Sequence, residues 1–183
     1  MLSTAQRRRT TRDKIRNDAG RRRLKVAVLM GGVGHEREVS LVSGREIAAA
    51  LKAAGHLVAP WELTSTDPRQ LDGLEKGFDV AFLGLHGEYG EDGTIQHALA
   101  ERGVCYTGSG PEASARAFDK IRAKRLLGRA GVPLAAHGIL EFPFGARGIR
   151  HAVRMTGDGP WVVKPARMGS SVGVTLCRNR GQV

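Results

Sequence analysis

Three polar segments hold the side chains whose types and spacing suit chemistry. The first, residues 31–40, places Glu36, Arg37 and Glu38 behind a pair of glycines. Glycines after a strand let backbone N–H groups approach a ligand, and a helix N-terminus favours anions. These glycines do not have the dinucleotide-binding spacing. Glu36 could instead hold an ammonium group, with Arg37 balancing its charge, and a solvated charged turn explains the pattern equally well.

The second segment, residues 86–94, combines a histidine with acidic residues. His86, Glu91 and Asp92 could together bind a small polar substrate or a cation. The alternative is an ordinary loop in which Asp92 caps the next helix. We expect Asp92 to be such a cap, which leaves His86 as the better functional candidate.

The third segment, residues 161–174, brings a lysine out of an apolar run and into a glycine- and serine-rich loop. Lys164 would supply charge to a phosphate, and Gly169, Ser170 and Ser171 would supply N–H and hydroxyl donors. The order differs from the Walker loop, in which the glycines precede the lysine. A plain β-hairpin with a polar turn is the alternative. A lysine within an apolar run argues against it, because a buried charge needs a partner.

The elements that would position the first two segments alternate between strand and helix. The apolar runs predict strand 24–30, helix 40–54, strand 56–63, helix 68–76, strand 79–85 and helix 94–102. Ser40 or Ser43 is the expected cap of the first helix, and Gly55 ends it. This alternation predicts a parallel sheet with helices on both faces. Ligands bind such sheets at the carboxyl ends of the strands, where both segments lie.

A second unit is expected from Pro111 onward. Asp119 can cap a helix that runs to Ala130, and Gly131 and Pro133 stop it. The remaining pattern predicts strand 135–141, a helix ending at 155, strand 161–164 and strand 172–176. We therefore divide the chain into a basic disordered tail at 1–23, a first domain at 24–110 and a second domain at 111–183.

The charge of the chain is concentrated in its tail. The net charge is +11, but residues 1–23 alone hold nine basic and two acidic residues. The tail could bind nucleic acid or an anionic surface. It has no aromatic residue to stack on bases and no apolar stripe to enter a membrane, so a solvated extension is the favoured interpretation. We therefore expect neither nucleic acid nor a membrane as a partner.

Composition excludes other classes of protein. No apolar run approaches the roughly 20 residues needed to cross a bilayer, and the basic N-terminus lacks the apolar segment of a secretory signal. Cys105 and Cys177 lie far apart without metal-binding spacing. They are typical of reduced thiols, which favours a cytoplasmic protein.

Taken together, five motifs resemble the D-alanine–D-alanine ligases, a branch of the ATP-grasp superfamily. The motifs are Gly31-Gly32 with Glu36-Arg37-Glu38-Val39-Ser40, His86-Gly87 with Gly90-Glu91-Asp92-Gly93-Thr94-Ile95-Gln96, Tyr106-Thr107-Gly108-Ser109-Gly110, Asp119-Lys120, and Val163-Lys164-Pro165 with Gly169-Ser170-Ser171-Val172-Gly173. Their order and spacing agree with the family from about Lys25 to Val174. The resemblance implies an α/β fold: a Rossmann-like parallel-sheet pre-ATP-grasp domain, followed by the first, incomplete part of an ATP-grasp domain.

The resemblance also implies roles for particular residues. Glu36 would hold the ammonium of the first D-alanine, and Ser170 would hold Glu36 in place. The other implied contacts are Val39 and His86 with that substrate, and Lys120, Lys164, Gly169 and Ser171 with ATP. The implied reaction joins two D-alanines for peptidoglycan synthesis through an acyl-phosphate, with ATP and two magnesium ions.

Some family features differ or lie elsewhere. Met168 stands where the family usually has an acidic residue. The magnesium ligands that the resemblance implies are expected beyond Val183, so no metal ligand is predicted within the chain. The rival interpretation is a catalytically incompetent fragment that binds only D-alanine or a partner chain. The sequence does not distinguish D-alanine, D-lactate and D-serine as the second substrate. Members of the family commonly dimerise, so the resemblance suggests a homodimer.

Overall fold

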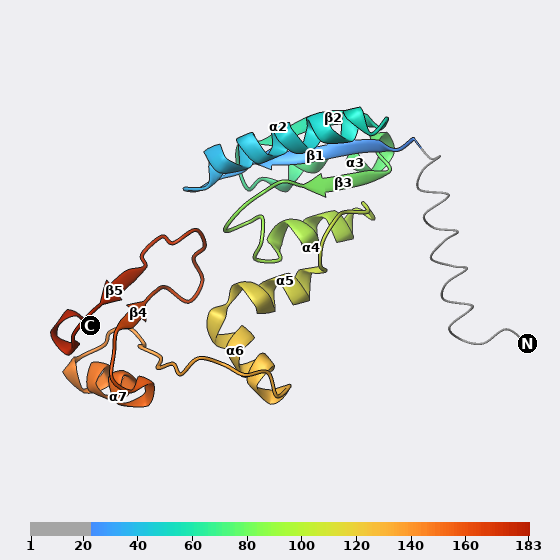
Figure 1. Cartoon of the computed structure of the whole chain (residues 1–183). Coiled ribbons are helices and arrows are strands. Elements are labelled where there is room, and N and C mark those ends of the chain that lie inside the picture. The colour runs from blue at the N-terminus through green and yellow to red at the C-terminus, as the bar shows by residue number, and fades with distance from the viewer. Residues whose placement is uncertain (1–22) are drawn as a thin grey trace, which may run out of the picture.

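A parallel three-stranded sheet forms the centre of the first unit. The computed structural model describes residues 23–183, so all of the predicted tail except Arg23 lies outside the described residues. Strand β1 (Lys25–Gly31) pairs in parallel with both β2 (Leu57–Leu63) and β3 (Val80–Leu83), in the order β2-β1-β3 (Figure 1). The parallel sheet predicted from the sequence is confirmed.

Helices cover both faces of this sheet, as the alternation predicts. Side chains of β1 point alternately to the two faces, so one strand contributes to two apolar clusters. Val28 and Met30 pack against α2 (Arg37–Ala53), with Ala48 among the buried residues. Ala27 and Leu29 pack on the opposite side, against α3 (Leu74–Gly77) and α4 (Thr94–Glu101).

Two helix starts differ from the prediction. The helix expected from Ser40 or Ser43 begins earlier, at Arg37, and Glu36 occupies its N-cap without a side-chain bond. The single helix expected over 68–76 is two short ones, a 3-10 helix η1 (Pro68–Leu71) and α3. Gly73 separates them because its φ of +93° lies in the left-handed region, which interrupts a right-handed helix.

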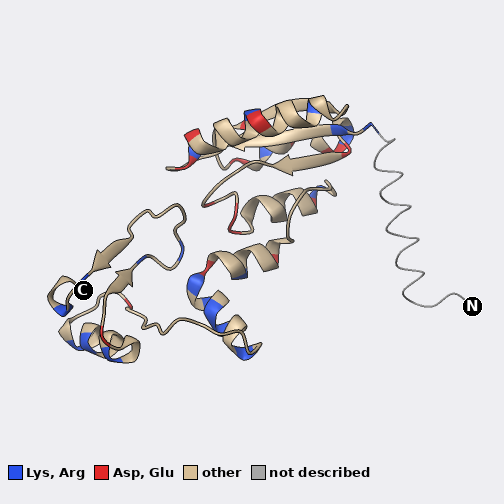
Figure 2. Cartoon of the chain, in the orientation of Figure 1, with Lys and Arg blue, Asp and Glu red and all other residues tan. Residues whose placement is uncertain are grey.

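The second unit is built from helices and one small hairpin. Its helices are α5 (Pro111–Phe118), α6 (Lys120–Arg129), α7 (Ala146–Thr156) and the short η2 (Arg180–Gln182). Strands β4 (Trp161–Val163) and β5 (Thr175–Cys177) pair antiparallel. Figure 2 shows many Lys and Arg residues on α6 and α7.

One predicted strand in this unit is wrong, and one helix was not predicted. Residues 135–141 form no strand, and the segment is largely exposed. A strand needs a neighbour to satisfy its N–H and C=O groups, and none lies beside this segment in the described structure. Helix α5 fills a stretch that the sequence analysis treated only as the start of a domain.

Asp119 joins α5 to α6. It follows the last residue of α5 and is the N-cap of α6, where its Oδ1 accepts hydrogen bonds from Ile121 N (3.0 Å) and Arg122 N (3.1 Å). The predicted cap is therefore confirmed.

The two cysteines lie in different environments. Cys105 is exposed at the edge of the first unit, whereas Cys177 on β5 is fully buried. The Cys177 thiol donates to the carbonyl oxygen of Gln182 at 3.1 Å. Within residues 23–183, none of the helices has the length and apolar character that crossing a membrane requires.

Candidate functional site

A small cavity lies where two loops of the first unit meet the loop of the β4–β5 hairpin. Its walls come from the loop after β1, from the loop after β3 and from residues 164–174, which we call the flap. Glu36, His86 and Gly169 each contribute to the lining, so residues from all three predicted segments meet at one place. The sequence predicted the two loops at one sheet edge, and the flap completes the cavity from the second unit.

Glu36 presents an unpaired carboxylate to this cavity. The residue is half-buried at the N-cap of α2, and no hydrogen bond or ion pair engages its side chain within residues 23–183. A Cβ atom added to Gly169 would lie 3.1 Å from Glu36 Oε2, and one added to Gly87 would overlap the same oxygen. Glycines in both neighbouring loops therefore let the backbone close around the carboxylate.

The sequence analysis suggested that Arg37 balances the charge of Glu36, but the structure shows a different partner for Arg37. Its guanidinium pairs with the carboxylate of Glu62 at the end of β2. Nη1 also donates to the carbonyl oxygens of Gly32 (3.1 Å) and Leu63 (2.9 Å). Arg37 thus ties together the ends of β1 and β2, and the negative charge of Glu36 stays available to a ligand.

The ring of His86 is hydrogen-bonded on one side and lies near a carboxylate on the other. Its Nε2 lies 3.0 Å from Ser43 Oγ on α2, and its Nδ1 lies 3.7 Å from Glu91 Oε1 in its own loop. Asp92 closes that loop by accepting from Tyr89 N (3.1 Å) and from Thr94 N (2.9 Å), the first residue of α4. Asp92 thus bonds to the helix start as expected, although Gly93 occupies the N-cap position itself.

Tyr89 anchors the same loop in the core. Its side chain is 6% exposed, and its φ of +69° lies in the left-handed region, which is uncommon for a bulky residue. Burial raises the pKa of the Tyr89 phenol above its ordinary value. The loop that carries His86 therefore rests on a buried aromatic ring.

Ser40 and Val39 differ from their predicted places. Ser40 is fully buried, and its hydroxyl accepts from Gly31 N (2.9 Å) and donates to the Gly84 carbonyl oxygen (2.7 Å). It joins the ends of β1 and β3 below the cavity, a role that the sequence analysis missed when it weighed Ser40 only as a cap. Val39 is 52% exposed and does not line the cavity.

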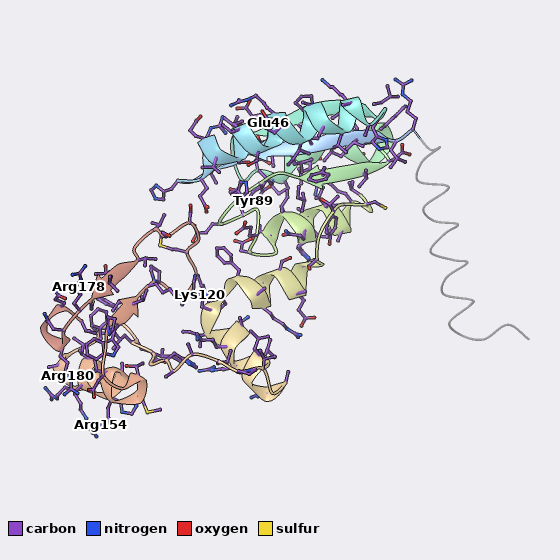
Figure 3. All side chains as sticks on the ribbon, viewed as in Figure 1. Glu46, Tyr89, Lys120, Arg154, Arg178 and Arg180 are labelled. Atoms are coloured by element: carbon purple, nitrogen blue, oxygen red, sulfur yellow. The ribbon has the colours of Figure 1, made fainter. Side chains whose placement is uncertain are left out.

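The flap is bonded to the start of α6. Lys120 Nζ donates to the Met168 carbonyl oxygen at 2.6 Å, and Lys120 N donates to the Ala166 carbonyl oxygen at 3.0 Å. Figure 3 shows Lys120 near the junction of α5 and α6, on the side of the flap. Lys164 is exposed at the end of β4.

Ser170 and Ser171 shape the tip of the flap. Both have positive φ angles, +49° and +62°. Among the described residues no hydrogen bond joins Ser170 to Glu36, and the flap residues that line the cavity are Met168, Gly169 and Val172. The predicted contact between Ser170 and Glu36 therefore stays a prediction.

Asp119 bonds to both the flap and the start of α6. Its Oδ2 accepts from Arg167 Nε at 3.0 Å, while its Oδ1 caps α6. The Arg122 backbone N–H and the Arg167 guanidinium hold the pKa of this carboxyl below its ordinary value. In contrast, residues 23–183 contain no group of three His, Cys, Asp or Glu side chains placed to hold a metal ion.

Sequence comparisons match the chain to one family of enzymes. The family described as "D-ala D-ala ligase N-terminus" matches residues 62–109. D-alanine–D-alanine ligase from Acidiphilium cryptum is 44% identical over 154 residues, which is 84% of this chain and 49% of that protein. The ligase of the same name from Dechloromonas aromatica is 46% identical over 160 residues, covering 86% of this chain and 50% of its own length.

Solved structures of enzymes with these names have a fold similar to that of this chain. The D-alanyl-alanine synthetase A of Vibrio cholerae has a TM-score of 0.71 at 27% identity, over 87% of this chain and 53% of that structure. The Bacillus anthracis D-alanine–D-alanine ligase complexed with ATP has a TM-score of 0.61 at 29% identity, over 84% of this chain and 50% of its own. The chain therefore spans about half the length of the relatives that it matches.

Proposed function

We propose, given that this chain corresponds to the amino-terminal part of the D-alanine–D-alanine ligases, that it contributes the site for the first D-alanine and part of the ATP phosphate site. The complete enzyme would join two D-alanines for peptidoglycan synthesis in the cytoplasm. Relatives that carry this name align over most of the chain, which supports the proposal.

The unpaired carboxylate of Glu36 is the observation that carries the proposal. A half-buried carboxylate without a partner favours a cation, because taking a charge out of water is costly unless it is paired. The ammonium of an amino acid fits this need, and Arg37 does not compete because it pairs with Glu62. His86, hydrogen-bonded to Ser43 and 3.7 Å from Glu91, would contact the same small substrate.

The phosphate side of the site would be formed by Lys120, Lys164 and the flap. Lys120 has an ammonium that currently bonds only a carbonyl oxygen, a weaker partner than a phosphate. Gly169 and Ser171 would donate N–H and hydroxyl groups to phosphate oxygens, and Ser170 would help to hold Glu36. ATP would supply the phosphoryl group that activates the substrate carboxylate as an acyl-phosphate.

The described residues do not form a magnesium site by themselves. Mg²⁺ takes carboxylate oxygens and water at a compact octahedral site, and residues 23–183 offer no suitable cluster. The roles proposed for these residues are therefore binding and orientation.

Titration of the 183-residue chain with D-alanine tests the proposal. We expect binding that weakens at least tenfold in Glu36→Gln, since the substitution removes the counter-charge of the ammonium and keeps the shape. Glu38→Gln is the matched control, because this exposed neighbour does not line the cavity. Equal binding by wild type and Glu36→Gln would overturn the assignment of Glu36.

The second candidate is a fragment that binds D-alanine without catalysis. It is supported for the chain alone by its length, since the chain spans about half of the ligases that it matches. Phosphate release in the presence of ATP, magnesium and D-alanine separates the two candidates. Release that depends on both D-alanine and Glu36 would support catalysis by the chain itself, and D-alanine binding without release would support the fragment.

A further inference from the structure

Asp119 is bonded on two sides that serve different parts of the molecule. The residue is 7% exposed, and each of its carboxylate oxygens is engaged. Oδ1 accepts from Ile121 N and Arg122 N, which fixes the carboxylate to the start of α6. Oδ2 accepts from Arg167 Nε at 3.0 Å, which fixes it to the flap. A helix N-terminus stabilises a negative charge, so Asp119 is a rigid anionic anchor.

Three consecutive flap residues are bonded to this anchor and its neighbour. The carbonyl oxygens of Ala166 and Met168 accept from Lys120 N and Lys120 Nζ, and the Arg167 side chain between them reaches Asp119. The next residue, Gly169, is the one that approaches the Glu36 carboxylate. The bonds made by residues 166–168 therefore fix the chain immediately before Gly169, the residue that approaches Glu36.

We propose that Asp119 and Arg167 are positioning residues that clamp the flap over the Glu36 carboxylate. This inference rests on the proposed function, since it assigns the clamp to the same substrate site. Six of the eleven flap residues are exposed and none is fully buried, and the hydrogen bonds Val172 N to Gly169 O and Val174 N to Ser171 O lie within the flap itself. Such a loop opens easily unless specific bonds hold it.

The flap has three bonds to the start of α6, and only one of them uses the ammonium of Lys120. In the proposed ligase the ammonium of Lys120 would turn to phosphate oxygens, which gives up its bond to the Met168 carbonyl. The Arg167–Asp119 bond does not use that ammonium. The flap therefore stays attached through Arg167, and through the Lys120 N–H bond to the Ala166 carbonyl oxygen, while the Lys120 ammonium exchanges one partner for another.

Hydrogen exchange of the complete 183-residue chain, without ligand, tests the clamp. Asp119→Asn keeps an amide oxygen that can cap α6 but loses the charge that holds Arg167. Arg167→Gln removes the other partner. We expect amide exchange in residues 168–174 to rise about fivefold in both variants, with α6 unchanged, and Arg167→Lys to restore part of the protection.

Arg180→Gln is the matched control, because it breaks another exposed pair of the second unit, with Asp158 at 3.0 Å. It should leave exchange in residues 168–174 unaltered. Flap exchange within twofold of wild type in both test variants would overturn the clamp. An equal rise in α6 and the flap would also overturn it, since loss of the cap alone gives that result. Failure of the proposed function would give a different result. The wild-type protein would not bind D-alanine, while amide exchange in residues 168–174 would still rise in Asp119→Asn.

Discussion

The backbone of Gly87 lies against the carboxylate of Glu36, closely enough that a Cβ atom would overlap Oε2. Gly87 also has a φ of +71°, which other residues adopt only with strain. The loop after β3 and the start of α2 are thus in contact at a carboxylate that faces the cavity and has no side-chain partner within residues 23–183. The conformation of the loop that carries His86 therefore affects the position of the Glu36 carboxylate that faces the cavity.

Gly87→Ala should abolish D-alanine binding, because the new methyl group displaces the Glu36 carboxylate from its position. We also expect a loss of about 1–2 kcal/mol in the free energy of unfolding from the positive φ. Calorimetric titration and chemical denaturation measure the two effects.

Gly55→Ala separates these effects. Gly55 has a φ of +92° and open space around it, so its alanine variant should lose similar stability and keep D-alanine binding. Gly87→Ala protein that binds D-alanine as wild type does would show that the close contact does not position Glu36.

Ser40→Ala should destabilise the first unit. The substitution leaves a buried N–H at Gly31 and a buried carbonyl at Gly84 without their shared partner. Unsatisfied buried groups of this kind cost about 1–3 kcal/mol each. Urea denaturation checks the expectation, and Ser43→Ala serves as the comparison because its partner His86 is only part-buried. A smaller loss for Ser40→Ala than for Ser43→Ala would contradict the assignment.

Arg37→Met should cost more stability than Glu62→Gln, although the two residues form one ion pair. Arg37 also donates to two carbonyl oxygens at the strand ends, and these would lose their partner. We expect about 1–3 kcal/mol for Arg37→Met and less than about 1 kcal/mol for Glu62→Gln, whose pair is exposed. Equal losses would mean that the ion pair alone matters.

Acid should weaken the stabilisation that Asp119 provides. Its pKa is lower in the folded protein than the usual 3.8, because N–H groups of α6 and Arg167 favour the charged form. The contribution is therefore complete above the unfolded pKa and is lost as pH falls through the folded pKa. The stability difference between wild type and Asp119→Asn should shrink between about pH 5 and pH 3. A difference that does not change with pH would contradict this account.

The sequence predicted the sheet well because its signals are local. Buried parallel strands appear as short apolar runs, and the run before Gly31 and Gly32 matches β1 to within one residue at each end. Asp119 was predicted as a cap for the same reason, since a cap bonds N–H groups two and three residues away.

Long-range partners could not be predicted in this way. Residues 135–141 resemble a strand in composition, but a strand depends on a neighbour that sequence patterns do not identify. Arg37 was expected to balance Glu36 because the two are adjacent, whereas its partner Glu62 lies 25 residues away. Helix α5 did leave a local signal, a proline at its first position with Glu112 in its first turn.

The different burial of Cys105 and Cys177 gives the protein a built-in reporter of partial unfolding. A thiol reagent should modify Cys105 at once and reach Cys177 only when the β4–β5 hairpin opens. The rate of the slow modification then measures the opening equilibrium of the β4–β5 hairpin. The modification rate of Cys177 thus reports local opening around the hairpin, with Cys105 as the internal reference and no engineered label.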